Sequence, residues 1–573
     1  MLGARLEVYV VVHAFEEYRE YEAASYHQLL GIKDADGVRA TGTEDLAGDS
    51  RPVGAADGEQ KGATHALTVV GDGTLGCSGE VGEPDMRHLW VLGDQLGPHF
   101  GDESMPTVLI ESRSMFRRRR YHRQKAHLML TAMRMRATEA NTTLVRAETF
   151  ADGLAEIGTP VEVWHPHSRA AVSMARRLGA VVRDGTPGFL TPWEEFDAWA
   201  RGRGKTRLLL EDWYRTVRRD HRILMDGSDP TGGRWNFDEM NREPPPRGRD
   251  RLLDRTPVRP AETDIDQEVR ALLDRWEAEG IEFLGRDGPR QFAASRSEAL
   301  AVLDDFVAYR LAEFGPYEDA MMSGDPFLAH SLLSAPLNLG LLAPGEVVDA
   351  AVRAYHAGTV PLPSVEGFVR QVVGWREYVW HLYWHLGEDY ADMNFLDART
   401  PQPEWFERLE STEITAACLS DVMAGVAERG WVHHIPRLMV LANWALQRGY
   451  EPAALNDWFQ RAFVDGYPWV MAANVVGMGL FADGGIVATK PYASGGAYIN
   501  RMSNYCGGCR YSPTVRVGED ACPFTAGYWW FLDRHRERLA GNHRMSRALA
   551  GLRSRPDMGD IRAQEESRSG DAP

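Results

Sequence analysis

Hydrophobic positions follow two different patterns along the chain, and the change between them falls near residue 262. From Arg87 onward, short apolar runs end in glycine or polar turns, and segments with helical spacing separate them. The runs predict buried strands at 88–96, 107–111, 159–164 and 180–183, with a helix at 122–140. Strands and helices that alternate at this interval predict a parallel, Rossmann-like α/β domain over residues 87–215.

After Asp264 the strand signals disappear, and apolar residues recur at the spacing of helices. This pattern predicts an all-α domain over residues 263–550. The expected helices cover 266–279, 297–314, 345–357, 364–386, 413–429, 434–448 and 452–464.

Three further segments lack such periodicity. Residues 1–86 are rich in Gly, Ala, Asp, Thr and Glu and predict a disordered extension. Residues 216–262 contain several prolines together with Trp, Asn and Phe, which indicates an interdomain linker packed on the fold. Residues 551–573 predict a polar tail.

The composition is that of a globular protein, with a net charge of -18 and 59 Arg against 5 Lys. The chain has no uncharged apolar run long enough to span a membrane and no signal peptide with a cleavage site. With few cysteines, these features favour a cytoplasmic protein that makes no membrane contact. A negative net charge disfavours nucleic acid on average, so DNA binding would require a local positive patch.

Three of the five cysteines fall within seventeen residues near the C-terminus. Cys506 and Cys509 form a Cys-x2-Cys pair, and Cys522 follows with Pro523 directly after it. Three thiolates do not complete a four-ligand site, and the nearest candidate for a fourth is Cys418. The spacing predicts a four-thiolate site for an iron–sulfur cluster or zinc, and the Cys-Pro ending favours iron–sulfur. A disulfide with buried free thiols is the alternative.

Other polar groups stand at positions suited to ligand binding. Asp94 and Gln95 follow the first strand, where ligands of parallel sheets bind, although a simple turn explains them equally well. Arg117–Lys125 is the densest basic run, and it indicates either a solvated face or a phosphate-facing patch.

In the helical half, polar residues recur on apolar helices. The hydroxyls of Ser331 and Ser334 precede a helix and suit either capping or phosphate binding. Arg376 lies inside an apolar helix and therefore requires an anionic partner. His434 and Arg437 are three residues apart on one helix, and Asp465 is a candidate partner for Arg437.

With these residues in view, the chain resembles the photolyase/cryptochrome superfamily, specifically its bacterial iron–sulfur branch of prokaryotic (6-4) photolyases. The resemblance covers about 87–550, and the longest match runs from Ala482 to Phe524. The remaining matching motifs are GDQL at 93–96, Ala132 to Arg134, GGRWNFD at 232–238, Asp319 to Met321, HSLLS at 330–334, GWREY at 374–378 and HHIPRLM at 433–439.

The resemblance implies an antenna-type α/β domain and an all-α FAD-binding domain in a monomeric enzyme that acts on ultraviolet-damaged DNA. It implies FAD and a [4Fe-4S] cluster, and often a 6,7-dimethyl-8-ribityllumazine antenna in the α/β domain. The expected reaction is light-dependent repair of (6-4) pyrimidine photoproducts by electron transfer from excited, reduced FAD.

Site residues follow from the matching motif positions. The expected cluster ligands are Cys418, Cys506, Cys509 and Cys522. The expected FAD contacts are His330, Ser331, Leu333, Ser334, Asn338, Arg376, Arg437 and Asp465. His434, next to His433, would protonate the lesion, and Trp458 would belong to the electron-transfer chain.

Four positions depart from the family pattern. The Trp that usually precedes the first cluster Cys is absent, and Trp405 is the nearest one. Phe459 stands where Tyr is frequent, and Met115 and Met471 replace acidic residues. Two other functions use related features: a cryptochrome-like photoreceptor that binds FAD without repair, and a zinc-stabilised DNA-binding protein without photochemistry.

Overall fold

The computed structural model describes residues 87–204, 207–568 and 570–573. The predicted extension over residues 1–86, including Cys77, lies outside the described residues. No helix in the described part of the chain is both long enough and apolar enough to cross a membrane.

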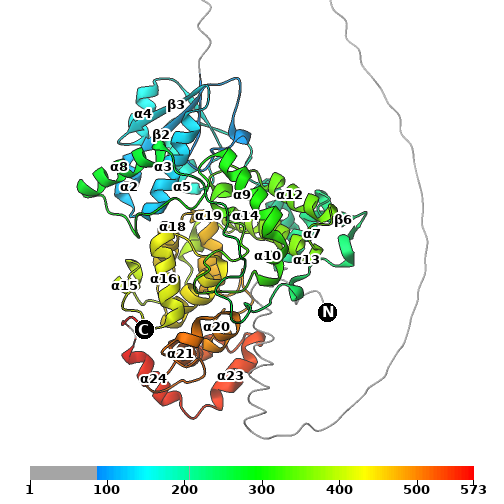
Figure 1. Cartoon of the computed structure of the whole chain (residues 1–573), viewed down its shortest axis with the longest axis vertical. Coiled ribbons are helices and arrows are strands. Elements are labelled where there is room, and N and C mark those ends of the chain that lie inside the picture. Colours follow the sequence, from blue (N-terminus) through cyan, green and yellow to red (C-terminus); the bar gives the residue numbers. More distant parts are fainter. Residues whose placement is uncertain (1–86, 205–206, 569) are drawn as a thin grey trace, which may run out of the picture. The chain divides into compact units, whose positions relative to one another are not determined.

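A five-stranded parallel sheet forms the centre of the α/β domain (Figure 1). The strand order is β3-β2-β1-β4-β5, which confirms the predicted fold class. The strands are β1 (His88–Trp90), β2 (Thr107–Ser112), β3 (Thr142–Ala147), β4 (Val161–Trp164) and β5 (Val181–Arg183). Strand β3 was not among the predicted strands, because it lies at the sheet edge and most of its residues are partly exposed.

Alternate residues of the strands belong to two different cores. Leu89 and Leu109 pack with residues of helix α3 (Arg123–Ala137) in a core that continues into the helical half of the chain. Trp90 and Ile110 point the other way and pack with helices α4 (Phe150–Ile157) and α5 (Arg169–Arg177). Both faces of the sheet are therefore covered, as parallel sheets require.

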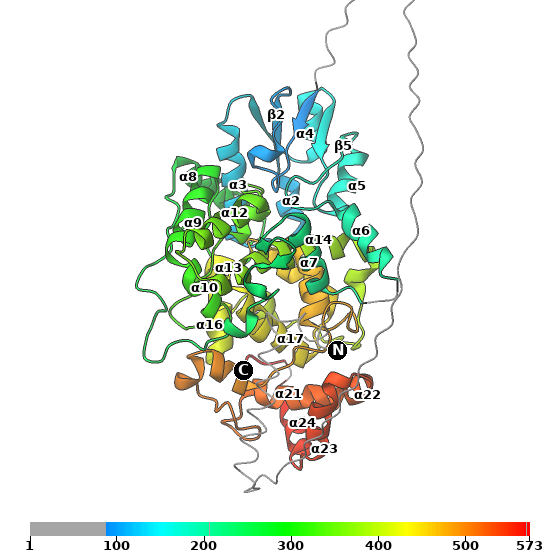
Figure 2. The same ribbon diagram turned by 90° about the vertical axis from the view of Figure 1, so that its right-hand side faces the viewer.

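The second half of the chain is almost entirely helical (Figure 2). Helices α2 (Arg113–Arg118), α6 (Trp193–Gly202) and α7 (Leu210–Asp220) precede it. Its helices are α8 (Asp264–Ala278), α9 (Arg296–Tyr309), α10 (Leu311–Tyr317), α11 (Ser334–Asn338), α12 (Pro344–His356), α13 (Leu362–Val369), α14 (Glu377–His385), α15 (Glu404–Glu407), α16 (Ala417–Arg429), α17 (Asn443–Arg448), α18 (Pro452–Ala462), α19 (Pro468–Met471), α20 (Gly496–Met502), α21 (Pro523–Arg534), α22 (Arg536–Leu539), α23 (Ser546–Arg553) and α24 (Met558–Ser567). Three π-helical segments lie between them: η5 (Arg370–Arg376), η7 (Pro436–Ala442) and η8 (Ala472–Gly479).

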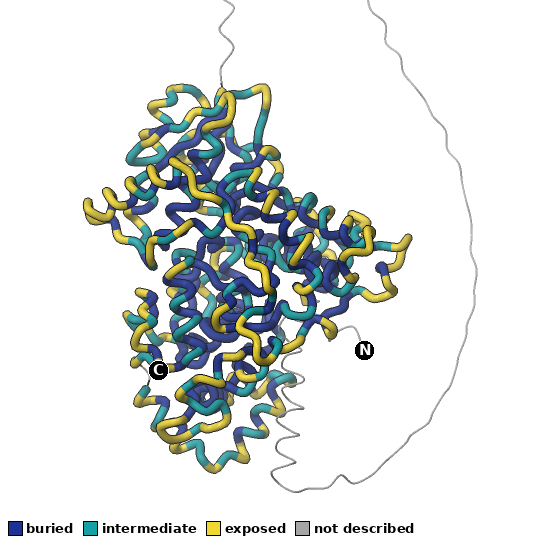
Figure 3. Tube along the Cα trace, in the orientation of Figure 1, coloured by how far each residue is buried: buried dark blue, intermediate teal, exposed yellow. Residues whose placement is uncertain are grey.

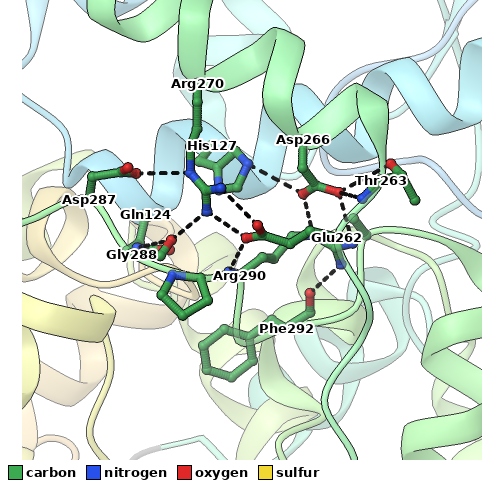
Figure 4. A network of polar contacts seen from close by, with 12 residues as sticks. Gln124, His127, Glu262, Thr263, Asp266, Arg270, Asp287, Gly288, Arg290 and Phe292 are labelled. Carbon is green, nitrogen blue, oxygen red and sulfur yellow. Dashed lines mark hydrogen bonds and ion pairs between the residues drawn. The ribbon is translucent and has the colours of Figure 1, made fainter.

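A buried polar network joins the α/β domain to helix α8 (Figure 4). His127 on α3 lies 3.3 Å from the Asp266 carboxylate, and Arg290 donates to the same carboxylate at 2.7 Å. Burial raises the pKa of Asp266, but hydrogen bonds from His127 and Arg290 outweigh it and hold the pKa well below its usual value. The paired charges make this network a structural junction.

The segment 551–573, expected as a polar tail, contains helix α24 and packs on the fold, so the expectation was wrong in this respect. Figure 3 shows buried positions among the exposed ones near this end of the chain. Ile561 and Glu565 are fully buried, and Glu565 pairs with the buried Arg448 of α17. Only these few positions face the core, so the apolar signal in the sequence is too weak to predict the docking.

Removing the buried carboxylate should destabilise the protein strongly. We expect Glu565→Ala to lower the free energy of unfolding by about 3–5 kcal/mol, because it leaves Arg448 buried without its partner. The neighbouring Glu566 is exposed, so Glu566→Ala should change stability by no more than about 0.5 kcal/mol. Urea denaturation of both variants measures the difference, and equal midpoints would show that the ion pair contributes nothing.

Candidate functional site

A cavity of about 330 Å³ lies within the helical half of the chain. Its walls carry aromatic and aliphatic side chains with a few convergent polar groups, as ligand pockets usually do. The lining residues include His330, Ser331, Leu333, Ser334, Asn338, Arg376, His433, His434, Arg437, Phe459, Asp465, Trp469, Met471 and Asn474.

All three π-helical segments border this cavity. Segment η5 contributes Arg376, η7 contributes Arg437 and η8 contributes Asn474. A π turn inserts an extra residue into a helix, which redirects the side chains after it, and such turns are frequent at functional sites. The predicted helix 364–386 is therefore divided into α13, η5 and α14, with Arg376 at the end of η5.

The turn before helix α11 forms one polar edge of the cavity. Leu332 has a φ of 61°, a left-handed conformation that L-residues with bulky side chains adopt only when surrounding structure enforces it. The Ser331 hydroxyl accepts from the backbone N–H of Leu333 at 3.3 Å, and the Asn338 amide donates to the Asp465 carbonyl at 3.1 Å. The turn thereby places Ser331 and Ser334 on the cavity wall.

Arg376 supplies a buried positive charge. Its guanidinium lies 3.2 Å from the Glu377 carboxylate and 4.4 Å from the centroid of the Phe189 ring. Burial lowers the pKa of Arg376 to about 10 and raises the pKa of Glu377 to about 7. The Arg376 Nε has no hydrogen-bond partner among the described residues, so this group retains a donor for an anionic ligand.

Arg437 and Asp465, which also line the cavity, form the expected ion pair. The guanidinium donates two parallel hydrogen bonds to the carboxylate, at 2.9 and 3.0 Å. Arg437 Nε also donates to the Val432 carbonyl at 2.7 Å, and Arg437 Cζ lies 4.2 Å from the centroid of the Phe463 ring. The fork geometry fixes both side chains.

Three histidines meet at the cavity. The rings of His330 and His433 are stacked with centroids 4.2 Å apart, and their pKa values fall well below the usual range because both are buried. His434 lies edge-on to His330 and is 36% exposed, and its Nε2 is 3.7 Å from the buried Asp319 carboxylate. His434 is therefore the member of the group that an incoming substrate can reach beside a carboxylate.

Trp458 does not line the cavity, but it contacts a residue that does. Its ring centroid is 5.1 Å from that of Phe459, which lies on the cavity wall, and 4.7 Å from that of Phe406. Trp405 directly precedes Phe406 in the sequence, and the centroids of these two rings are 5.6 Å apart. Trp405 is partly exposed. The aromatic contacts thus run from the cavity to the partly exposed Trp405.

The four cysteines come from three segments that are distant in sequence. Cys418 lies in the first turn of α16, Cys522 caps α21, and Cys506 and Cys509 lie at the short helical turn 505–508 between them. All four are free thiols in the described structure, so no disulfide joins any two of them. Burial raises the pKa of Cys418 well above its usual value, and the charges of Cys522, Cys506 and Cys509 act in the same direction.

Internal contacts occupy the edge of the sheet where Asp94 and Gln95 are candidates to line a small-molecule site. The Asp94 carboxylate lies 3.2 Å from His167 Nδ1, and the Gln95 amide donates to the Trp164 carbonyl at 3.2 Å. These contacts join the ends of β1 and β4, where the strand order reverses and ligands of such sheets bind. Sequence reasoning identified Asp94 and Gln95 as candidates, but it did not include His167 in this group.

Comparison with known proteins shows that this chain is similar to a relative over nearly the whole length of that relative. A (6-4) photolyase from Agrobacterium fabrum is 38% identical over 489 residues, which covers 80% of this chain and 94% of the relative. The family model described as deoxyribodipyrimidine photo-lyase-related protein matches residues 157–288. A crystal structure of a bacterial class III photolyase from Agrobacterium tumefaciens is 17% identical with a TM-score of 0.49, covering 74% of this chain and 88% of that one.

Proposed function

Because the chain belongs to the photolyase/cryptochrome superfamily, we propose that it repairs ultraviolet-damaged DNA in light, with (6-4) pyrimidine photoproducts as its substrates. One observation carries this proposal. All ten residues that the family resemblance assigns to FAD binding and lesion protonation line a single cavity. They come from segments between residues 330 and 465, and chance would not gather them at one site.

The cavity wall fits the parts of FAD. Ser331, Ser334 and the free donor of Arg376 suit the phosphates, because hydroxyls and guanidinium groups bind such anions. Aromatic and aliphatic residues, among them Trp469 and Met471, suit the apolar flavin ring. When bound, reduced and excited by light, FAD supplies the electron that starts repair of the lesion.

The protein provides proton delivery and orientation. Such repair requires the lesion to leave the DNA stack and enter the pocket. His434, the partly exposed member of the histidine group, would transfer a proton to the lesion as a general acid. Burial lowers the pKa values of His330 and His433, which disfavours their protonated forms.

We also propose a [4Fe-4S] cluster held by Cys418, Cys506, Cys509 and Cys522. The Cys-Pro ending at Cys522 supports a cluster over a single zinc ion. A ribityllumazine antenna in the α/β domain remains a prediction from the family resemblance, and Trp458 remains the predicted electron-transfer residue.

Survival after ultraviolet irradiation tests the proposed function in cells. A bacterial strain without photolyase that produces this protein should survive better when it is illuminated with blue light than when it is kept dark. Arg376→Met should abolish the difference, because it removes the buried charge at the expected phosphate site. Equal survival in light and darkness, with flavin bound to the protein, would support a cryptochrome-like photoreceptor instead.

A further inference from the structure

The basic segment Arg117–Lys125 does not face solvent throughout. Its first residues are exposed, but Arg123 and Lys125 are buried at the junction with the helical half of the chain. The two buried residues contact different partners. Arg123 forms ion pairs with Asp274 and Glu277 on α8, whereas Lys125 reaches the end of α18.

Lys125 caps a helix that contributes to the cavity. The last carbonyls of an α-helix have no partner within the helix and carry its negative dipole end, so a cation there is favourable. Lys125 Nζ donates to the Gln460 carbonyl at 2.8 Å, and the His122 backbone N–H donates to the Arg461 carbonyl at 2.9 Å. Both carbonyls belong to the last turn of α18, which also carries Phe459 of the cavity wall.

The same ammonium group holds the turn that follows α18. Lys125 Nζ donates a second hydrogen bond to the Gly466 carbonyl. The residue before Gly466 is Asp465, whose carboxylate forms the fork with Arg437 and whose carbonyl accepts from Asn338. Lys125 therefore fixes one side of a turn whose other side forms part of the cavity wall.

The surroundings of Lys125 suit a compact cation. The ring centroids of Tyr467 and Tyr121 lie 4.9 and 5.5 Å from its Nζ. Burial lowers the pKa of Lys125 to about 7, and the charge of Asp465 acts in the opposite direction. The chain uses Arg for 59 of its 64 basic residues, and a planar guanidinium is larger than the ammonium that fits between these two carbonyls.

We propose that Lys125 is a positioning residue for the flavin site, through which the α/β domain holds Asp465 against Arg437. This inference rests on the proposed function only where it identifies the cavity ligand as FAD. The positioning of residues 463–467 by Lys125 holds whatever the cavity binds.

Three variants of the purified holoprotein test the proposal. Lys125→Met keeps the side-chain stem and removes the charged donor, Lys125→Gln keeps a neutral donor, and Arg123→Met removes the neighbouring domain contact as a matched control. We measure the FAD dissociation constant from the fluorescence of released flavin, the amide exchange of residues 463–467, and the melting temperature.

Lys125→Met should weaken FAD binding roughly 10- to 100-fold, since hydrogen bonds from a charged donor typically contribute that much. It should also speed amide exchange in the turn, while Lys125→Gln gives an intermediate effect and Arg123→Met changes only the melting temperature. Combined with Asp465→Asn, Lys125→Met should add little, because both changes disrupt the same contact.

Several results would overturn the proposal. Unchanged FAD binding in Lys125→Met, an equal loss in Arg123→Met, or full additivity with Asp465→Asn would each show that Lys125 only joins the two domains. If Lys125→Met does not fold, Lys125→Gln decides between the same outcomes. Absence of flavin from the wild-type protein would contradict the proposed function, and amide exchange of the turn would still decide the role of Lys125.

Discussion

His434→Ala should retain FAD but lose (6-4) repair by about 10²- to 10⁴-fold, the usual contribution of a positioned general acid. His434 is the exposed member of the histidine group, and its Nε2 faces the buried Asp319 carboxylate. A lesion that receives an electron also needs a proton, because the electron otherwise returns before the bond rearranges. Single-turnover repair of a damaged oligonucleotide under blue light measures the loss.

The exposed His356 on α12 provides a control for this experiment. His356→Ala should repair at the wild-type rate, because this exposed residue is not among those that line the cavity. Wild-type repair by His434→Ala would eliminate the proposed proton transfer. Loss of bound FAD in that variant would assign His434 to cofactor binding instead.

Cys418→Ala should lose iron and sulfide. It should also lower the free energy of unfolding by about 4 kcal/mol or more, as the loss of a metal site typically does. Cys418 lies on α16, while its three expected partners lie between 506 and 522, so a shared cluster joins distant segments. Iron and sulfide analysis of anaerobically purified protein, followed by urea denaturation, measures both effects.

Cys77 gives a chemically matched control. It is the one cysteine outside the expected ligand set, so Cys77→Ala should keep full iron and sulfide content. Zinc without iron in the wild-type protein would contradict the cluster, and an unchanged stability of Cys418→Ala would remove Cys418 from the ligand set.

Periodicity predicted the two fold classes because most helices and strands bury a regular apolar face. Strand β3 and helix α24 escaped prediction because few of their residues are buried. The three π segments were also not predicted, since an apolar pattern over two turns is compatible with α or π geometry and tertiary packing decides between them.

The cavity residues were predictable mainly through motifs rather than through spacing. Residues 330 and 465 are far apart in sequence, and no local pattern indicates that they meet. The pairing of Arg437 with Asp465 was predictable from charge. The role of Lys125 was not, because a run of basic residues usually indicates a solvated surface and burial is visible only in the fold.

The most direct test of the account is repair by the purified protein with bound, reduced FAD. A duplex oligonucleotide that carries one (6-4) photoproduct is incubated with the protein in blue light or in darkness, and the restored pyrimidines are measured by chromatography. The account predicts restoration in light and none in darkness. An unrepaired lesion after illumination, with FAD bound and reduced, would contradict it.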